Sequence, residues 1–278
     1  SNNIYKNGSG TLQLNGDLSA FSGNFVLNFG TLTIGGVNSG VPSLGTGTSG
    51  LILNGSGSAD RTILSLQNNG TGSNGVITYQ DNNDVELRGA VTINVDRNFV
   101  GGANTGNTIV LDNLNMGGGI LQTNGGNSYA LRFDGTTTLG GQTNVFSPNS
   151  AQLTLAGPVT DGSATRALIK EGAGRLVISN VANTYNGPTA IKDGVLQLSA
   201  GANLGTGITY INGGALSPQN KATLDATSTT GLVLVGQLGT SRYVLPAIGI
   251  SQSYGTIDAA NPVNVNVPVA GMALAIDS

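Results

Sequence analysis

Gly174–Ile178, with the sequence GRLVI, decides the fold of this 278-residue chain, because it is the first of three segments that are in register. Gly194–Leu198 (GVLQL) and Gly214–Leu216 (GAL) follow it at a constant step, since the segments begin at positions 174, 194 and 214. Short apolar runs that alternate with polar residues are typical of β-strands. Strands that recur at a fixed step, each preceded by glycine, indicate a coil that completes one turn per step.

The N-terminal part of the chain shows the same pattern. Gly10–Leu14 (GTLQL) and Gly30–Ile34 (GTLTI) are separated by the same step, and residues 6–34 align without a gap with residues 170–198. Seven positions of this alignment are identical, including Lys6 and Lys170. The positions that define the repeat are Gly10, Leu12, Gly30, Leu32, Gly174, Leu176, Gly194, Leu196, Gly214 and Leu216.

The repeat predicts an all-β fold, a right-handed parallel β-helix (β-solenoid) with about 20 residues per turn. Pairs of Asn and Gly between the runs would by themselves favour antiparallel hairpins. Identical residues that recur once per step favour stacking instead, with the leucines in inward columns and the glycines at tight corners. We expect one solenoid over residues 1–278, with repeat-bearing segments 6–66 and 168–220, a less regular middle 67–167, and a proline-containing end region 221–278.

The amino-acid composition excludes several classes of function. Charged residues make up 9% of the chain, against roughly 25% in an ordinary soluble domain, while 38% hydrophobic residues are enough for a core. The 11 Lys and Arg residues are scattered, which argues against a nucleic-acid-binding surface. The chain has no apolar run long enough for a transmembrane helix. Without His and Cys, the usual Ser-His-Asp and Cys-His catalytic groups and most zinc sites are excluded.

Carboxylate chemistry is what remains. The sequence DNNDVE at 81–86 contains Asp81, Asp84 and Glu86, which could supply paired carboxylates for glycoside hydrolysis or oxygen ligands for calcium. We interpret this cluster as a solvated turn that leads into a strand at 85–87, because Asn and Asp favour turns. We therefore predict no catalytic residue, no cofactor and no metal site, with these three residues as the alternative.

Residues 168–216 resemble the passenger-associated transport repeat of autotransporters. The resemblance rests on Lys170–Ile178 (KEGAGRLVI), Asn183–Ile191 (NTYNGPTAI), Gly194–Leu198 (GVLQL) and the Leu-Gly pair at 204–205. Residues 6–55 match more loosely, and Phe21 stands where the family favours Tyr. The resemblance implies a parallel β-helix that is carried to the outside of a bacterial cell, in which the repeat is a scaffold and secretion element.

These observations predict a non-enzymatic, extracellular structural or adhesive protein of the bacterial cell surface, in the form of a β-helical stalk or fibre segment. A β-helical glycan-active enzyme or a glycan-binding module is the alternative. A carboxylate pair in a groove beside residues 81–86 would favour the alternative. As partners we expect a surface glycan or receptor, and either head-to-tail stacking of copies into a filament or continuation of a longer chain.

Overall fold

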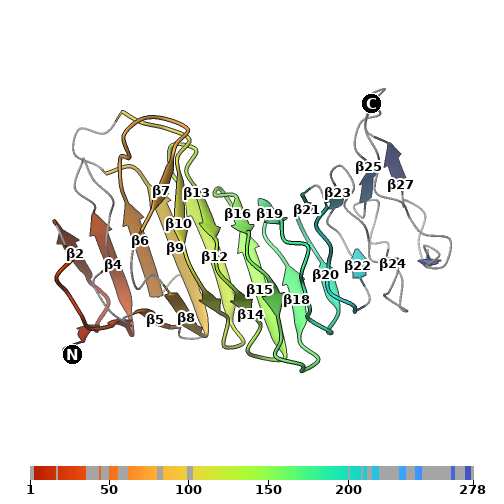
Figure 1. The fold of residues 1–278 in the computed structure, drawn as a ribbon, viewed down its shortest axis with the longest axis horizontal. Coiled ribbons are helices and arrows are strands. Elements are labelled where there is room, and N and C mark those ends of the chain that lie inside the picture. Colours follow the sequence, from red (N-terminus) through yellow and green to blue (C-terminus); the bar gives the residue numbers. More distant parts are fainter. Residues whose placement is uncertain are drawn as a thin grey trace.

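The computed structural model describes residues 3–16, 18–35, 44, 50–55, 62–79, 84–98, 103–199, 201–207 and 209–211, and beyond these the strand segments 215–218, 232–235, 242–245, 264–266 and 273–276. This part of the chain contains 27 β-strands and no helix, so it contains no helix that could cross a membrane. Every strand pairing is parallel, which confirms the predicted parallel β-helix. The rungs of the coil follow one another from the N-terminal to the C-terminal end (Figure 1).

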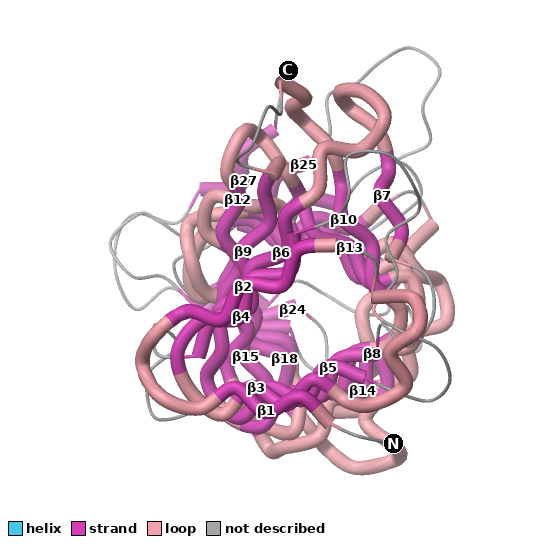
Figure 2. Tube along the Cα trace, turned by 90° about the vertical axis from the view of Figure 1, so that its left-hand side faces the viewer, coloured by secondary structure: helices cyan, strands magenta, loops and turns pink. Residues whose placement is uncertain are grey.

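Three sheets form the sides of the coil, as the view along its axis shows (Figure 2). The seven-stranded sheet consists of β1 (Ile4–Lys6), β3 (Phe25–Leu27), β5 (Gly50–Asn54), β8 (Asp84–Arg88), β11 (Leu114–Asn115), β14 (Thr137–Thr138) and β17 (Val159–Thr160). The nine-stranded sheet consists of β7 (Val76–Thr78), β10 (Thr108–Leu111), β13 (Ala130–Phe133), β16 (Leu153–Leu155), β19 (Arg175–Ile178), β21 (Val195–Leu198), β23 (Ala215–Pro218), β25 (Arg242–Leu245) and β27 (Ala273–Ile276).

The eleven-stranded sheet runs through the whole described coil. It consists of β2 (Thr11–Asn15), β4 (Gly30–Gly35), β6 (Thr62–Gln67), β9 (Ala90–Asp96), β12 (Ile120–Gly125), β15 (Thr143–Pro148), β18 (Ala167–Lys170), β20 (Thr189–Ile191), β22 (Thr209–Ile211), β24 (Leu232–Val235) and β26 (Asn264–Asn266). Parallel strands lie about 4.8 Å apart, so eleven of them span roughly 48 Å.

The length of a rung, meaning one full turn of the coil, varies along the chain. In the eleven-stranded sheet, Thr11 pairs with Thr31 and Thr189 pairs with Thr209, so the step of the repeat is kept in both places. The rungs between them are longer, because Gly30 pairs with Thr62 and Ala90 pairs with Ile120. The expected step therefore describes single rungs, such as those from Thr11 to Thr31 and from Thr189 to Thr209, and not the coil as a whole. Extra residues are accommodated between strands, where they do not disturb the strand register.

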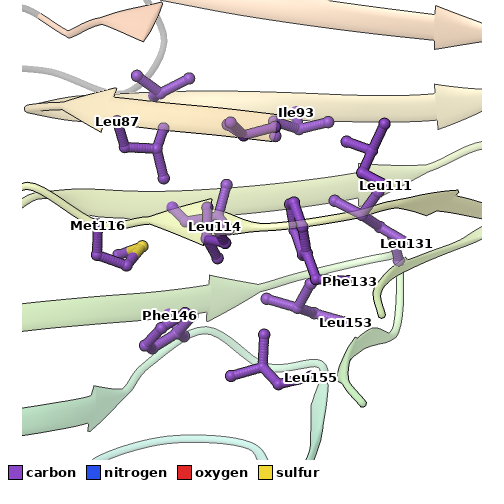
Figure 3. Packing of buried hydrophobic residues seen from close by; sticks show 14 of the residues in the cluster. Leu87, Ile93, Leu111, Leu114, Met116, Leu131, Phe133, Phe146, Leu153 and Leu155 are labelled. Carbon is purple, nitrogen blue, oxygen red and sulfur yellow. The ribbon is translucent and has the colours of Figure 1, made fainter. Parts of the chain in front are cut away.

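The core is built from inward columns that run parallel to the axis. The predicted column of Leu176, Leu196 and Leu216 is confirmed in register, and it continues backwards through Leu153 and Leu131. A second column on the same sheet contains Leu111, Phe133 and Leu155 (Figure 3). These described side chains of β10 to β21 are fully buried, so apolar burial is the main stabilising force along the coil. Gly214, the last predicted corner glycine, lies outside the described residues.

Candidate functional site

The best-defined polar arrangement in the molecule is the corner after β18, where Lys170 is buried. Its Nζ atom donates hydrogen bonds to the carbonyl oxygens of Glu171 (2.6 Å), Gly172 (2.7 Å) and Asp193 (3.0 Å). Glu171 and Gly172 belong to the same corner, whereas Asp193 belongs to the corner of the next rung. The ammonium group therefore joins two successive rungs at a place where backbone carbonyls point toward one another.

The stem of Lys170 lies in an inward column of the eleven-stranded sheet. Lys170 pairs with Phe146 on one side and with Ile191 on the other, and none of the three side chains is exposed. Burial lowers the pKa of Lys170 to about 8, while the carboxylates of Asp193 and Glu171 act to raise it. Three carbonyl dipoles provide the acceptors that a buried ammonium group needs.

Lys6 makes the same three contacts in the first copy of the repeat. Its Nζ atom donates to the carbonyl oxygens of Asn7 (3.1 Å), Gly8 (2.6 Å) and Phe29 (3.0 Å), which correspond one by one to those of the second corner. We call these two arrangements the lysine corners. Lys6 and Lys170 are buried in the same way, so the corner is a repeated structural unit.

Each lysine corner also needs a glycine in the next rung. Gly194 has a φ of 60°, and a Cβ atom added to it would clash with the Gly172 carbonyl oxygen and would lie 2.7 Å from Lys170 Nζ. Gly30 has a φ of 81°, and its added Cβ would clash with the Gly8 carbonyl oxygen. A side chain at either position would therefore displace the corner and strain the backbone.

The two copies preserve the corner while exchanging the pairs of side chains around it. Glu171 and Lys192 form an exposed ion pair of 2.9 Å, whereas the equivalent Asn7 and Asn28 form a hydrogen bond of 2.7 Å. Both pairs connect the outer surfaces of successive rungs. The geometry of the repeat therefore depends on matched pairs and not on one chemical type.

A second exchange occurs inside the coil. The Tyr185 hydroxyl and Thr189 Oγ1 share a hydrogen bond of 2.7 Å in the second copy. At the equivalent positions of the first copy, Phe21 and Phe25 pack with ring centroids 4.7 Å apart. An aromatic contact thus replaces a polar one, which explains why phenylalanine is tolerated where the repeat favours tyrosine.

Asn183 connects three rungs beyond the last strand of the seven-stranded sheet. Its Oδ1 atom accepts a hydrogen bond from the backbone N–H of Val159 (2.8 Å), and its Nδ2 atom donates to the carbonyl oxygen of Asn203 (2.7 Å). The side chain is buried. In the first copy, β1 and β3 belong to the seven-stranded sheet. In the second copy, Asn183 and its hydrogen bonds connect the rungs on this side of the coil, where the sheet has ended.

The two lysine corners lie at different edges of the coil. β1 and β2 flank the first corner and belong to the seven-stranded and eleven-stranded sheets, whereas β18 and β19 flank the second and belong to the eleven-stranded and nine-stranded sheets. The second copy is therefore displaced by one side of the coil relative to the first. A corner can occupy either edge because its contacts reach only the adjacent rung.

Two of the three residues of the predicted carboxylate cluster lie in the described part of the chain. Asp81 lies outside the described residues, while Asp84 and Glu86 both belong to β8 and face outward into an open hollow of about 380 Å³ on the seven-stranded sheet. Asn113 donates to Asp84 through its backbone N–H (3.2 Å) and its Nδ2 atom (2.9 Å), and Arg88 donates to Glu86 (2.7 Å). Both carboxylates thus already accept hydrogen bonds within the sheet.

Further carboxylates stand near this hollow. Burial, followed by the negative charges of Asp84 and Asp134, raises the pKa of Asp112. Among the described residues, no three carboxylates come together in a way that could hold a metal ion. The calcium alternative therefore has no described site, and Asp84 with Glu86 remains as a pair.

Both lysine corners lie in segments that match a known protein family. Residues 4–34 and 168–198 match the family model of the passenger-associated-transport-repeat. The chain carries two copies of this repeat. Comparisons with curated proteins and with solved structures found no match. The two repeats suggest a passenger-like domain of the autotransporter type, and such repeats point to a secreted or cell-surface protein.

Each repeat match covers one lysine corner together with the glycine of the following rung. The role of the lysines could not be recognised from the sequence, although a signal was present, because Lys6 and Lys170 are identical in the internal alignment. A lysine in a strand is ordinarily interpreted as solvated. Only the coil brings the carbonyl groups of two corners within reach of one ammonium group.

Proposed function

We propose that this chain is a non-enzymatic structural and adhesive segment of a surface protein, a β-helical stalk that exposes its sheet faces outside the cell. The lysine corners support this proposal most directly. Lys6 and Lys170, near the start of each repeat, donate to backbone carbonyls and hold rungs together. A repeat whose lysines bind the backbone carbonyls of successive rungs is suited to an extended scaffold.

The uninterrupted core supports the same proposal. Buried side chains stack from β4 to β20 on the eleven-stranded sheet, so rungs follow one another without a break between the two repeats. Repeat proteins of this type gain stability from contacts between neighbouring units, and they present extended faces for binding. A stalk needs both properties.

The test is an adhesion experiment with the purified chain. Beads that carry the protein should be retained on glycan-bearing cell surfaces more than uncoated beads, and the protein should produce no reducing ends or unsaturated products from a panel of polysaccharides. Retention equal to that of uncoated beads would contradict the adhesive part of the proposal.

A glycan-active enzyme is the second candidate, because Asp84 and Glu86 face the same hollow. Alternate residues of a strand are roughly 6.6 Å apart along the strand, close to the separation of about 6.5–9.5 Å between the carboxyl groups of inverting glycosidases. Turnover of a polysaccharide that disappears in both Asp84→Asn and Glu86→Gln would support this candidate against the stalk.

A further inference from the structure

The outer face of the nine-stranded sheet carries a second hollow, an open trough of about 590 Å³. Its lining comes from β10, β13, β16, β19 and β21 and from residues directly beside these strands, so the trough crosses five rungs parallel to the coil axis. This volume is in the range of small-molecule binding sites, about 300–1,000 Å³. The trough is separate from the lysine corners and from the hollow beside Asp84.

The lining of the trough is rich in hydroxyl and amide groups. Thr154, Ser179 and Ser199 contribute hydroxyls, Gln152 and Gln197 contribute amides, and two of the lining residues, Ala156 and Val177, are apolar. Gln152 Nε2 donates to Thr154 Oγ1 at 3.3 Å, which links two columns of the face. Such a surface offers many hydrogen bonds and little apolar area, so its ligand must be rich in polar groups.

Two arginines line the trough, and they differ in whether a carboxylate pairs with them. Arg132 forms a two-point ion pair with Asp134, at 2.5 and 2.8 Å, so its charge is neutralised. Arg175 instead donates through Nη1 to the amide oxygen of Gln197, a side chain that is more than nine-tenths buried. The three ion pairs found among the described residues do not include Arg175.

Arg175 is thus an oriented positive charge that none of the described carboxylates pairs with. A guanidinium group has five N–H donors, and one of them is used by Gln197. The remaining N–H groups can donate to the oxygens of an anion such as a carboxylate or a sulfate. The anchoring amide is uncharged, so it fixes the position of the guanidinium group without cancelling its charge.

We propose that this trough binds an acidic glycan, with Arg175 pairing to a carboxylate or sulfate group and the surrounding hydroxyls and amides contacting sugar hydroxyls. The inference rests on the proposed adhesive function and names the ligand class for it. A nucleic acid would need several cations along its backbone. A docked protein would need buried apolar anchors, which two small apolar residues do not supply.

The spacing of the coil fits such a ligand. Neighbouring rungs are about 4.8 Å apart, close to the length of one sugar residue in an extended chain. A glycan that lies along the axis therefore meets one row of outward side chains per rung, and the chemistry of these rows differs from rung to rung. Arg175 sets the register of an acidic sugar among them.

The experiment measures binding of the whole chain to immobilised heparin, which carries sulfates and carboxylates, to polygalacturonate, which carries carboxylates alone, and to neutral dextran. The variants are Arg175→Gln, Gln197→Leu and, as the matched control, Arg88→Gln on β8 of the seven-stranded sheet. Arg88 is likewise exposed and located on a strand, but it is paired with Glu86. Thermal melting of each variant checks that it is folded.

We expect the wild type and Arg88→Gln to bind an acidic polymer but not dextran, with binding that weakens as salt is added. Arg175→Gln should weaken this binding at least tenfold, and Gln197→Leu should weaken it less because the charge remains. A preference for heparin over polygalacturonate would assign the site to sulfate, and the reverse would assign it to carboxylate.

Three results would overturn the inference: unchanged binding by folded Arg175→Gln, equal binding to dextran, or no binding to either acidic polymer. Bead retention on cells that does not change with Arg175→Gln would also overturn the acidic-glycan site, while it would leave the adhesive function standing. If beads that carry the wild type are retained no more than uncoated beads, the proposed function itself is contradicted.

Discussion

At the residue scale, two lysines show how a charge can be used inside a β-coil. A buried ammonium group is costly unless it is fully hydrogen-bonded. Lys6 and Lys170 meet this condition with three backbone carbonyls each, and their stems fill positions that leucines and isoleucines occupy in neighbouring rungs. The same residue therefore serves the core and the corner.

Replacing Lys170 by methionine tests this role. Lys170→Met keeps the apolar stem but leaves three carbonyl oxygens without their donor, so we expect the free energy of unfolding to fall by about 1–3 kcal/mol. Lys192→Met, which removes only the exposed partner of Glu171, should cost about 0–1 kcal/mol. Chemical denaturation of both variants provides the comparison, and equal losses would mean that the corner contacts contribute no more than the exposed ion pair.

The pH dependence of stability offers a separate test of Lys170. Its pKa is about 8 in the folded chain and 10.5 when unperturbed, so between these values the unfolded chain holds the proton that the folded chain has lost. Stability contributed by this group therefore rises with pH from about 8 toward 10. Denaturation at pH 7 to 10 should show a wild-type stability that increases relative to Lys170→Met.

Buried tyrosines limit the pH range over which the stability rises. Burial raises the pKa of Tyr79 and of Tyr185, so above about pH 10 the unfolded chain loses protons that the folded chain keeps, and stability falls. Comparison with Lys170→Met removes this contribution, because both proteins contain the tyrosines. A difference between the two proteins that stays flat or falls from pH 8 to 10 would contradict the assignment.

At the scale of elements, the corner before a strand depends on how closely the previous rung approaches. Gly174 and Gly10 are equivalent in the repeat, but their surroundings differ. Gly174 stacks on a preceding rung, where an added Cβ atom would clash with the Asn149 carbonyl oxygen, whereas Gly10 lies in the first rung described and an added Cβ atom would have no atom within 4 Å. The requirement for glycine is thus set by stacking and not by the motif alone.

This difference predicts unequal effects of one substitution. Gly174→Ala should destabilise the chain by about 1–3 kcal/mol, because the corner must shift to avoid overpacking. Gly10→Ala should be close to neutral, since the added methyl group meets open space. Thermal unfolding of the two variants checks the prediction, which would be wrong if Gly10→Ala were the more harmful change.

The internal exchange of polar and aromatic pairs makes a second prediction at this scale. Tyr185→Phe alone should cost about 1–3 kcal/mol, because it leaves the buried Thr189 hydroxyl without its partner. Tyr185→Phe combined with Thr189→Val should cost less than the single change, because both polar groups are then removed. Denaturation of the single and double variants measures this coupling, and a double variant less stable than the single one would oppose it.

At the scale of the whole molecule, the coil behaves as a row of rungs that contact only their neighbours. The two lysine corners lie on different edges and are separated by many rungs, so they should contribute independently. Contacts in such a repeat structure are local along the axis. A disturbance in one repeat should therefore stay near that repeat.

Hydrogen exchange can test this locality. Lys170→Met should speed amide exchange in β16 to β21, which flank the second corner, while β2 and β4 keep wild-type protection. Lys6→Met should give the reverse pattern, and the losses of stability in the double variant should add. Exchange that rises throughout the coil after either change would indicate one cooperative unit in place of a row of rungs.

The sequence by itself determined the fold class and the stacking columns. Strand period, corner glycines and the constant step are local signals, and they predicted the parallel coil and the register of Leu176 with Leu196. Insertions between strands leave these signals intact, because strand pairing depends on the strands and not on the length of the connections.

Only the tertiary structure decided how the rungs are arranged around the axis. It set the longer rungs between the repeats, displaced the second repeat by one side of the coil, and brought the carbonyl groups of two rungs around each lysine. It also separated Arg175 from the ion pair of Arg132 and Asp134. These features depend on contacts between residues of different rungs, which are distant in the sequence, and such contacts exist only once the coil has formed.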